Sequence, residues 1–178
     1  KNPNLLVEIL IPDFKNKSFA LDKIIESKPD VISHNIETVE RLQSYVRDRR
    51  ANYKQSLHVL EYVKKATPEM HTKSSLMVGL GETREEMEKT MHDLRAVKVD
   101  FLTIGQYLRP SLWNLPVKEY IKPDQFEWYE KKGLELGFKY VAAGPFVRTS
   151  YKAGEFFIKS TIKAPQVGTR QTHHDSIK

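Results

Sequence analysis

The sequence predicts an α/β fold with parallel strands. Short apolar runs alternate with helical patterns at least four times along the 178 residues, and such alternation is typical of parallel βαβ units. Four or five units cannot close an eight-stranded barrel, which usually takes about 250 residues. In an open sheet the first run would leave a long apolar edge unpaired. We therefore expect the later part of a larger barrel; a small doubly wound sheet, or an edge covered by another protein, are the alternatives.

The predicted strands are short runs of apolar residues. The first is nearly continuous, as expected for a strand covered on both faces, and a proline and an aspartate follow it. The predicted strands are 5–11, 30–34, 75–78, 99–104 and 138–143.

Helical spacing of apolar residues separates these runs. Asn52 is a good N-cap for one helix, and Pro123 opens the last one. Met87, Met91 and Leu94 recur at helical spacing, and we expect the methionines to fill the core rather than to line a cofactor site. The predicted helices are 19–27, a short one from 39, 53–65, 82–97 and 123–136.

The composition limits the class of protein. With 39% hydrophobic and 29% charged residues it is that of a soluble globular protein, and no window approaches the roughly 18 apolar residues of a membrane span. The net charge is +6, but acidic and basic residues are interspersed, so nucleic acid is not a favoured partner. Cysteine is absent, which excludes thiolate metal sites and cysteine nucleophiles within these residues.

A glycine-rich turn follows the third predicted strand. Gly79 and Gly81 allow a tight turn and let a ligand approach without a Cβ in the way. Glu82 begins an acidic segment where the next helix has its positive end. Ligands bind at this carboxyl end of the strands in parallel α/β folds. A G-x-G turn alone is weak evidence, and most such turns are only tight connections.

Several motifs in series give the chain a resemblance to the lipoyl synthase family. They occur in the family's order and spacing from about residue 5 to 157. The motifs are VEILIPDF at 7–14, HNIET at 34–38, RANYKQSL at 50–57, GLGE at 79–82, GQYLRP at 105–110, LPV at 115–117 and GPFVRTSYKAGE at 144–155.

The resemblance implies a partial TIM-like (βα) barrel of the radical SAM type, with the N-terminal strands missing from this chain. It also implies radical S-adenosylmethionine chemistry, in which two sulfur atoms are inserted into a protein-bound octanoyl chain. The implied cofactors are S-adenosylmethionine and two 4Fe–4S clusters. An unactivated C–H bond requires a radical that the protein shields from water. Residues 1–157 would form the barrel part, and 158–178 a polar C-terminal tail.

The resemblance also suggests residues for the S-adenosylmethionine site. Asn35 and Glu37 match a polar turn that contacts the cofactor, although they could instead cap the helix that begins near residue 38. Arg47 or Arg50 could pair with the cofactor's carboxylate, or be surface arginines. The other implied cofactor-binding residues are Gly79, Gly81 and Gln106.

The segment 148–151 matches the family's Arg-Ser-Ser-Tyr motif, in which a serine oxygen ligates the auxiliary cluster. That serine aligns with Thr149, and Ser150 is its neighbour. Threonine keeps the hydroxyl and adds a methyl group. Hydroxyls that bond to the backbone at a strand end are the alternative interpretation.

The chain departs from the family in two respects. Both cysteine motifs of the family belong upstream of residue 1, so these residues alone cannot hold either cluster. Leu112, Trp113 and Asn114 also replace basic residues and a histidine. The Leu-Trp pair suggests an interface, or a tryptophan packed under its own loop. The histidines at 71, 92, 173 and 174 fit no metal-ligand spacing.

Three functions therefore stay open. The chain is part of an active lipoyl synthase that acts on an octanoylated lipoyl-carrier protein, or it is an inactive structural subunit of a larger assembly. In the second case a protein partner would cover the open barrel edge. A plain binding module with a nucleotide-like pocket is a third reading. The expected location is mitochondrial, or cytoplasmic in a bacterium.

Overall fold

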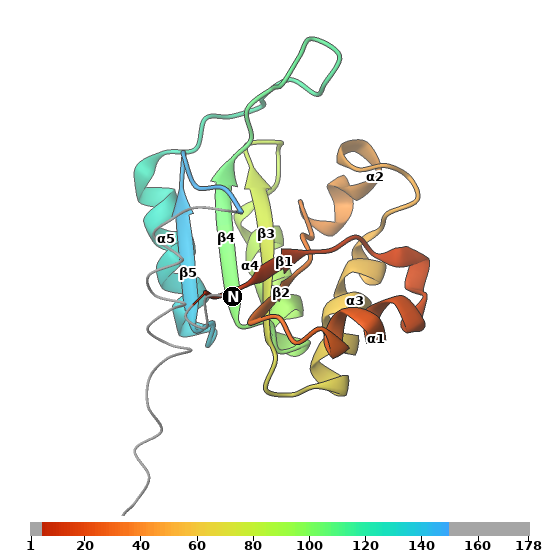
Figure 1. The fold of residues 1–178 in the computed structure, drawn as a ribbon. Helices are drawn as coiled ribbons and strands as arrows, with labels where there is room; N and C mark the ends of the chain where they lie inside the picture. The colour runs from red at the N-terminus through yellow and green to blue at the C-terminus, as the bar shows by residue number, and fades with distance from the viewer. Residues whose placement is uncertain (1–4, 150–178) are drawn as a thin grey trace, which may run out of the picture.

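The computed structural model describes residues 5–149. Within them, five parallel strands form one sheet in the order β1-β2-β3-β4-β5, and the sheet is not closed (Figure 1). The strands are β1 (Glu8–Leu10), β2 (Val31–Ser33), β3 (His71–Val78), β4 (Phe101–Gln106) and β5 (Tyr140–Gly144).

Each strand pairs with its neighbour in the sequence. Every crossover therefore moves in the same direction, and right-handed crossovers then place the helices on one face of the sheet. A doubly wound sheet would reverse its strand order at a switch point, which the described residues do not do. The predicted partial barrel is confirmed. The predicted boundary at residue 157 and the tail 158–178 lie outside the described residues.

Helices connect the strands, and α4 lies behind the sheet in Figure 1. Asn52 caps its helix as predicted, accepting a bond of 2.9 Å from the Gln55 amide. The helices are η1 (Phe14–Asn16), α1 (Ser18–Glu26), η2 (Glu40–Leu42), α2 (Gln43–Val46), α3 (Tyr53–Ala66), α4 (Arg84–Ala96) and α5 (Pro123–Glu135), where η marks 3₁₀ turns.

The main core lies between the sheet and these helices. Met87, Met91 and Leu94 are fully buried in it, beside Leu76 and Leu102 of the strands. The methionines therefore fill the core, as predicted. No helix in the described part of the chain is long and apolar enough to cross a membrane.

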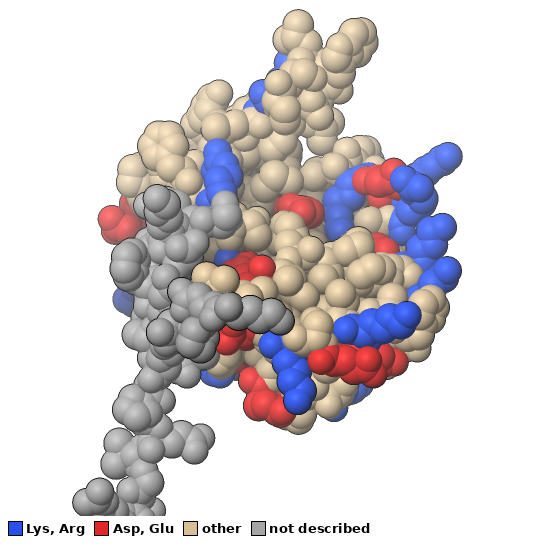
Figure 2. Space-filling view, in the orientation of Figure 1, with Lys and Arg blue, Asp and Glu red and all other residues tan. Residues whose placement is uncertain are grey.

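The opposite face of the sheet, which we call the inner face, carries polar side chains. Lys73 bonds to Glu8, and Glu8 accepts a bond of 2.6 Å from the Ser33 hydroxyl, so these residues of β3, β1 and β2 share one face. Ser75 and Thr103 lie on the same face by the alternation of strand residues. Basic and acidic side chains are interspersed over the surface seen in Figure 2.

Two expectations about strands need correction. The first strand was expected to be covered on both faces, but Val7 and Leu10 are exposed, because β1 is an edge strand within the described sheet. The third strand begins at His71 instead of residue 75. Its first half is polar: Lys73 is buried and pairs with Glu8, and the Ser74 hydroxyl accepts a bond from the Ile36 amide.

Candidate functional site

Two of the cavities formed by the described residues lie at the carboxyl ends of β1 to β4, where ligands bind in parallel α/β folds. The larger cavity, about 440 Å³, is lined by the segments after β1 and β2 and by the connection from α2 to α3. The smaller cavity, about 280 Å³, is lined by the ends of β3 and β4 and the segment after β5. Glu37 lines both cavities and forms part of the wall between them.

Glu37 is held in a left-handed backbone conformation, with φ of 67°. Its amide donates to the Ser75 carbonyl (3.0 Å), and its carbonyl accepts from the Met77 amide (2.8 Å). Burial raises the pKa of Glu37, and a bond from Asn35 and the charge of Arg47 oppose that shift. A left-handed residue other than glycine costs roughly 1–2 kcal/mol, and such strain clusters at functional sites. Glu37 is therefore a candidate site residue through its place in the wall of both cavities together with its backbone conformation.

Asn35 lies beside Glu37 in the larger cavity. Its Nδ2 donates to the Thr149 hydroxyl at 3.4 Å, whereas its Oδ1 is buried and has no partner among the described residues. An unpaired buried acceptor costs about 1–3 kcal/mol, so this oxygen suits a ligand donor. The alternative that Asn35 and Glu37 cap a helix finds no support, since Val39 is the N-cap of η2 and no side chain caps it.

Arg47 also lines the larger cavity, and it is half-buried. Its Nη1 donates to the Ser56 hydroxyl (2.8 Å) and to Gln43 Oε1 (3.1 Å). In the part of the chain that the structure describes, no carboxylate lies within 4.0 Å of it. Burial lowers the pKa of Arg47, while the charges of Glu37 and Asp13 raise it. A guanidinium stays charged in proteins, so this cation lacks a close counter-ion.

Arg50 differs from Arg47 in both partner and place. Its guanidinium binds both carboxylate oxygens of Asp48, at 2.8 and 3.0 Å, and its side chain is 77% exposed. It lines neither cavity. The structure thus brings together Asn35, Glu37 and Arg47 and leaves Arg50 outside the group.

The glycine turn serves the loop that follows β4. Gly79 and Gly81 have φ of 98° and 100°, but neither lines the two cavities. A Cβ on Gly79 would overlap the Gln106 amide and the Glu119 carbonyl oxygen, whereas the space beside Gly81 is open apart from the Lys118 side chain. The missing side chain of Gly79 therefore makes room for protein atoms.

Gln106 lines the smaller cavity, but its amide is engaged with backbone groups. Nε2 donates to the carbonyls of Val78 (3.2 Å) and Glu119 (3.0 Å), and Oε1 accepts from the Ile121 amide (2.9 Å). These bonds hold both ends of the connection from β4 to α5. Gln106 thus shapes the cavity through the loop that it anchors.

Thr149 follows β5 in the chain and lies over the inner face of the sheet, next to Lys73 of β3. Its carbonyl accepts a bond of 2.5 Å from Lys73 Nζ, which also pairs with Glu8 at 3.0 Å. Gly105 permits this path, since a Cβ there would overlap the Val147 carbonyl oxygen. Ser150, the other predicted cluster residue, lies outside the described residues. The part of the chain with described coordinates contains no group of three or more His, Cys, Asp or Glu that could hold a metal ion.

Sequence reasoning missed the polar residues of the inner face and the partners of Arg47. Glu8 and Lys73 could have been found as charged residues within strand segments, where alternation gives them one face. Ser56 carried no such signal, because it is one polar residue within a helix.

The loop between β4 and α5 projects beyond the carboxyl ends of the strands (Figure 1). Leu112 is 84% and Trp113 98% exposed, so the tryptophan is not packed under its own loop. Arg109 bonds to the carbonyls of Leu112 and Asn114, which fixes the turn that carries the pair. An exposed apolar pair on a fixed loop agrees with the predicted interface but does not identify its partner.

Comparison with known proteins gives one family. The family model of the Radical SAM superfamily matches residues 1–94. The mitochondrial lipoyl synthase of Arabidopsis thaliana is 53% identical over 171 residues, which are 96% of this chain and 46% of that protein. The mitochondrial lipoyl synthase of Populus trichocarpa is 56% identical over 163 residues, which are 91% of this chain and 42% of that protein. The apicoplast lipoyl synthase of Plasmodium falciparum is 52% identical over 160 residues, 90% of this chain and 39% of that protein. The chain spans less than half the length of these relatives. By the family match and these identities, the chain belongs to the radical SAM superfamily, as a relative of lipoyl synthases.

Proposed function

We propose that the chain is part of a lipoyl synthase and supplies one side of its S-adenosylmethionine site. One observation carries the proposal: a carboxylate, an unpaired amide oxygen and a guanidinium without a close counter-ion line the same cavity. The amino-acid end of S-adenosylmethionine carries an ammonium and a carboxylate. Glu37 and Asn35 Oδ1 would accept from the ammonium, and Arg47 would bind the carboxylate through a bidentate pair.

The residues around this cavity fit the cofactor in charge and in hydrogen bonding. When bound, S-adenosylmethionine supplies the radical chemistry that removes hydrogen from an unactivated C–H bond. The chain's own contribution is to bind and orient it, with Glu37 and Arg47 as fixed charges of opposite sign. The strained backbone of Glu37 is held by two bonds to β3, so the carboxylate is in place before a ligand arrives.

The iron–sulfur clusters do not fit the residues of this chain. Such clusters are held by cysteine thiolates, and the 178 residues contain no cysteine. Thr149 is proposed as an oxygen ligand of an auxiliary cluster because it matches the ligating serine of the family motif.

The proposed substrate is an octanoylated lipoyl-carrier protein, and the proposed location is the mitochondrion. The basis is the similarity to lipoyl synthases, of which those of Arabidopsis thaliana and Populus trichocarpa are mitochondrial. A second candidate is an inactive structural subunit of a larger assembly. The exposed Leu112–Trp113 pair favours it, because it offers apolar surface to a protein partner.

Binding of S-adenosylmethionine to the native protein tests the site. Arg47→Met should weaken the affinity in isothermal titration calorimetry by about 10- to 100-fold, the range for a lost hydrogen bond to a charged group. Arg50→Met is the matched control, since Arg50 already binds Asp48, and it should bind as the wild type does. Equal affinities for wild type and Arg47→Met would contradict the assignment.

The two candidate functions differ in a second measurement. After anaerobic reconstitution with iron and sulfide, an active lipoyl synthase shows the broad visible absorbance of iron–sulfur clusters. A native protein that binds S-adenosylmethionine but shows no such absorbance would favour the structural subunit.

A further inference from the structure

His34 is fully engaged inside the protein, next to the larger cavity. Its Nδ1 lies 2.9 Å from the Ile11 carbonyl oxygen, and its Nε2 lies 3.0 Å from the Ser56 hydroxyl. Because a carbonyl only accepts, Nδ1 carries the hydrogen in the neutral ring, and Nε2 accepts from Ser56. Burial lowers the pKa of His34, which agrees with a neutral ring.

This arrangement determines the direction of the Ser56 hydroxyl. Its hydrogen is directed to His34, so its lone pairs are free to accept, and Arg47 Nη1 donates to it at 2.8 Å. Ser56 is buried on α3. A serine without His34 could turn its hydrogen toward other acceptors, whereas the imidazole keeps the oxygen lone pairs on the side of Arg47.

Gln43 holds the same nitrogen of Arg47 from another side. Its Oε1 accepts from Arg47 Nη1 at 3.1 Å, and its Nε2 donates to the carbonyls of Ile36 (2.9 Å) and Thr38 (2.6 Å). The Gln43 amide is therefore fixed as well. Arg47 is held by two neutral acceptors, neither of which neutralises its charge.

We propose that His34 and Ser56 are positioning residues that orient the Arg47 guanidinium for a ligand carboxylate. This inference rests on the proposed function. A guanidinium recognises a carboxylate as a planar fork, so its orientation decides how many of its N–H groups reach the ligand. Holding one nitrogen with neutral acceptors leaves the charge and the remaining N–H groups for the ligand.

Two ligands separate positioning from a general structural role. S-adenosylmethionine has the carboxylate, and decarboxylated S-adenosylmethionine lacks only that group. Ser56→Ala in the native protein should weaken S-adenosylmethionine by about 3- to 10-fold, the range for one hydrogen bond, and leave the decarboxylated ligand unchanged. Ser56→Cys keeps the volume but is a weak acceptor, so it should show the same selective loss.

Ser27→Ala is the matched control, because the Ser27 hydroxyl bonds only to the Ile24 carbonyl of its own helix among the described contacts. It should bind both ligands as the wild type does. An equal loss for both ligands in Ser56→Ala, or no loss for either, would overturn the positioning role. Arg47→Met separates the binding role of Arg47 from the positioning role of His34 and Ser56. If Arg47→Met weakens both ligands equally or neither, the assignment of Arg47 to the carboxylate fails. If Arg47→Met discriminates between the ligands and Ser56→Ala does not, only the positioning role fails.

Discussion

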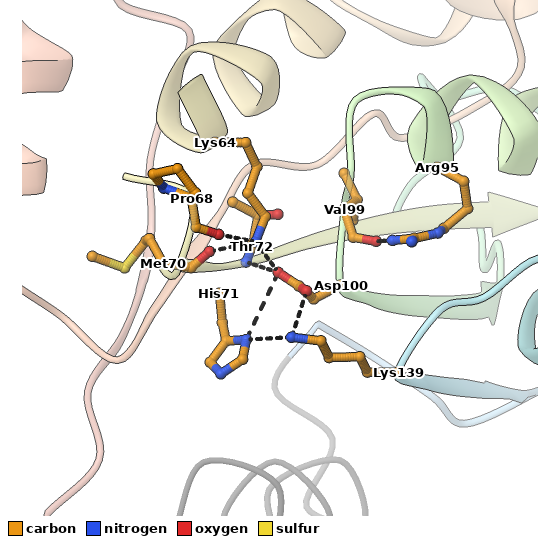
Figure 3. A network of polar contacts seen from close by, with 9 residues as sticks. All are labelled: Lys64, Pro68, Met70, His71, Thr72, Arg95, Val99, Asp100 and Lys139. Atoms are coloured by element: carbon orange, nitrogen blue, oxygen red, sulfur yellow. Dashed lines mark hydrogen bonds and ion pairs between the residues drawn. The ribbon is translucent and has the colours of Figure 1, made fainter. Parts of the chain in front are cut away.

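Asp100 is the centre of a polar network at the amino-terminal ends of β3, β4 and β5 (Figure 3). It lies 2.6 Å from Lys64 Nζ and 2.9 Å from Lys139 Nζ, and it accepts a bond of 3.0 Å from the Thr72 amide. The side chains of Asp100 and Lys64 are 6% and 8% exposed. The network joins α3 to the sheet at the end opposite the cavities, where residues of a βα barrel serve stability.

Asp100→Asn removes the charge and keeps the shape. The buried Lys64 ammonium then loses its counter-ion, although it still donates to the Met70 carbonyl at 2.7 Å. Breaking a buried pair by removing one partner costs about 3–5 kcal/mol. We expect the free energy of unfolding to fall by about 3 kcal/mol, the lower end of this range, because Lys64 keeps its bond to the Met70 carbonyl. For a chain of this length that lowers Tm by roughly 6–12 °C.

Thermal and urea unfolding at neutral pH measure the effect. Lys139→Met is the control: its side chain is 46% exposed, and exposed pairs contribute up to about 1 kcal/mol. Adding Lys64→Met to Asp100→Asn should recover most of the loss, since no unpaired buried charge is left. The reasoning is wrong if Asp100→Asn and Lys139→Met cost the same, or if the double variant is less stable than Asp100→Asn.

The same network gives a pH dependence. Burial would raise the pKa of Asp100, but hydrogen bonds from His71, Lys64 and the Thr72 amide outweigh it and hold the pKa well below the usual 3.8. The unfolded chain therefore takes up a proton first as pH falls. The stabilisation by Asp100 is present above about pH 4 and is lost at lower pH. The stability difference between wild type and Asp100→Asn should shrink below that pH in acid unfolding.

Two further predictions concern the functional site. Gly79→Ala should lower the free energy of unfolding by about 2–5 kcal/mol in urea, because the alanine would have a left-handed backbone conformation and its Cβ would overlap Gln106 and Glu119. An unchanged unfolding midpoint would contradict this packing. Glu37→Gln should raise Tm at pH 7, because it removes a charge that burial disfavours, and it should weaken the binding of S-adenosylmethionine in calorimetry. Burial raises the pKa of Glu37 above 4.5, so wild type loses stability as pH rises through that pKa. The gain in Tm should vanish below about pH 4.5; a gain that persists there would count against burial as its cause.

Most elements of the fold could be predicted from the sequence. The apolar alternation located all five strands and the longer helices, and Asn52 was identified as a cap because capping is a local interaction. The first half of β3 was missed for a physical reason. There the Thr72 amide donates to Asp100, and buried Lys73 pairs with Glu8; both partners lie far away in the sequence, and no local pattern reveals them.

The candidate site was predictable only in part. Motif resemblance pointed to Asn35, Glu37 and both arginines, but it could not choose between Arg47 and Arg50. The choice depends on what else each guanidinium touches: Asp48 neutralises Arg50, whereas neutral acceptors hold Arg47. The packing around Gly79 could not be predicted either, because the atoms beside it belong to Gln106 and Glu119, which are far away in the sequence.

The sequence by itself determined the parallel α/β architecture and the order of the elements, because hydrophobic periodicity and caps act within a few residues of chain, and its motifs in series pointed to the family. Only the tertiary structure decided the pairing of Glu8 with Lys73, 65 residues away, and the support of Arg47 by Ser56. Such contacts depend on strand register and on the path of the crossovers. Both follow from how the whole sheet packs, so the polar partners of a site are known only when the chain is folded.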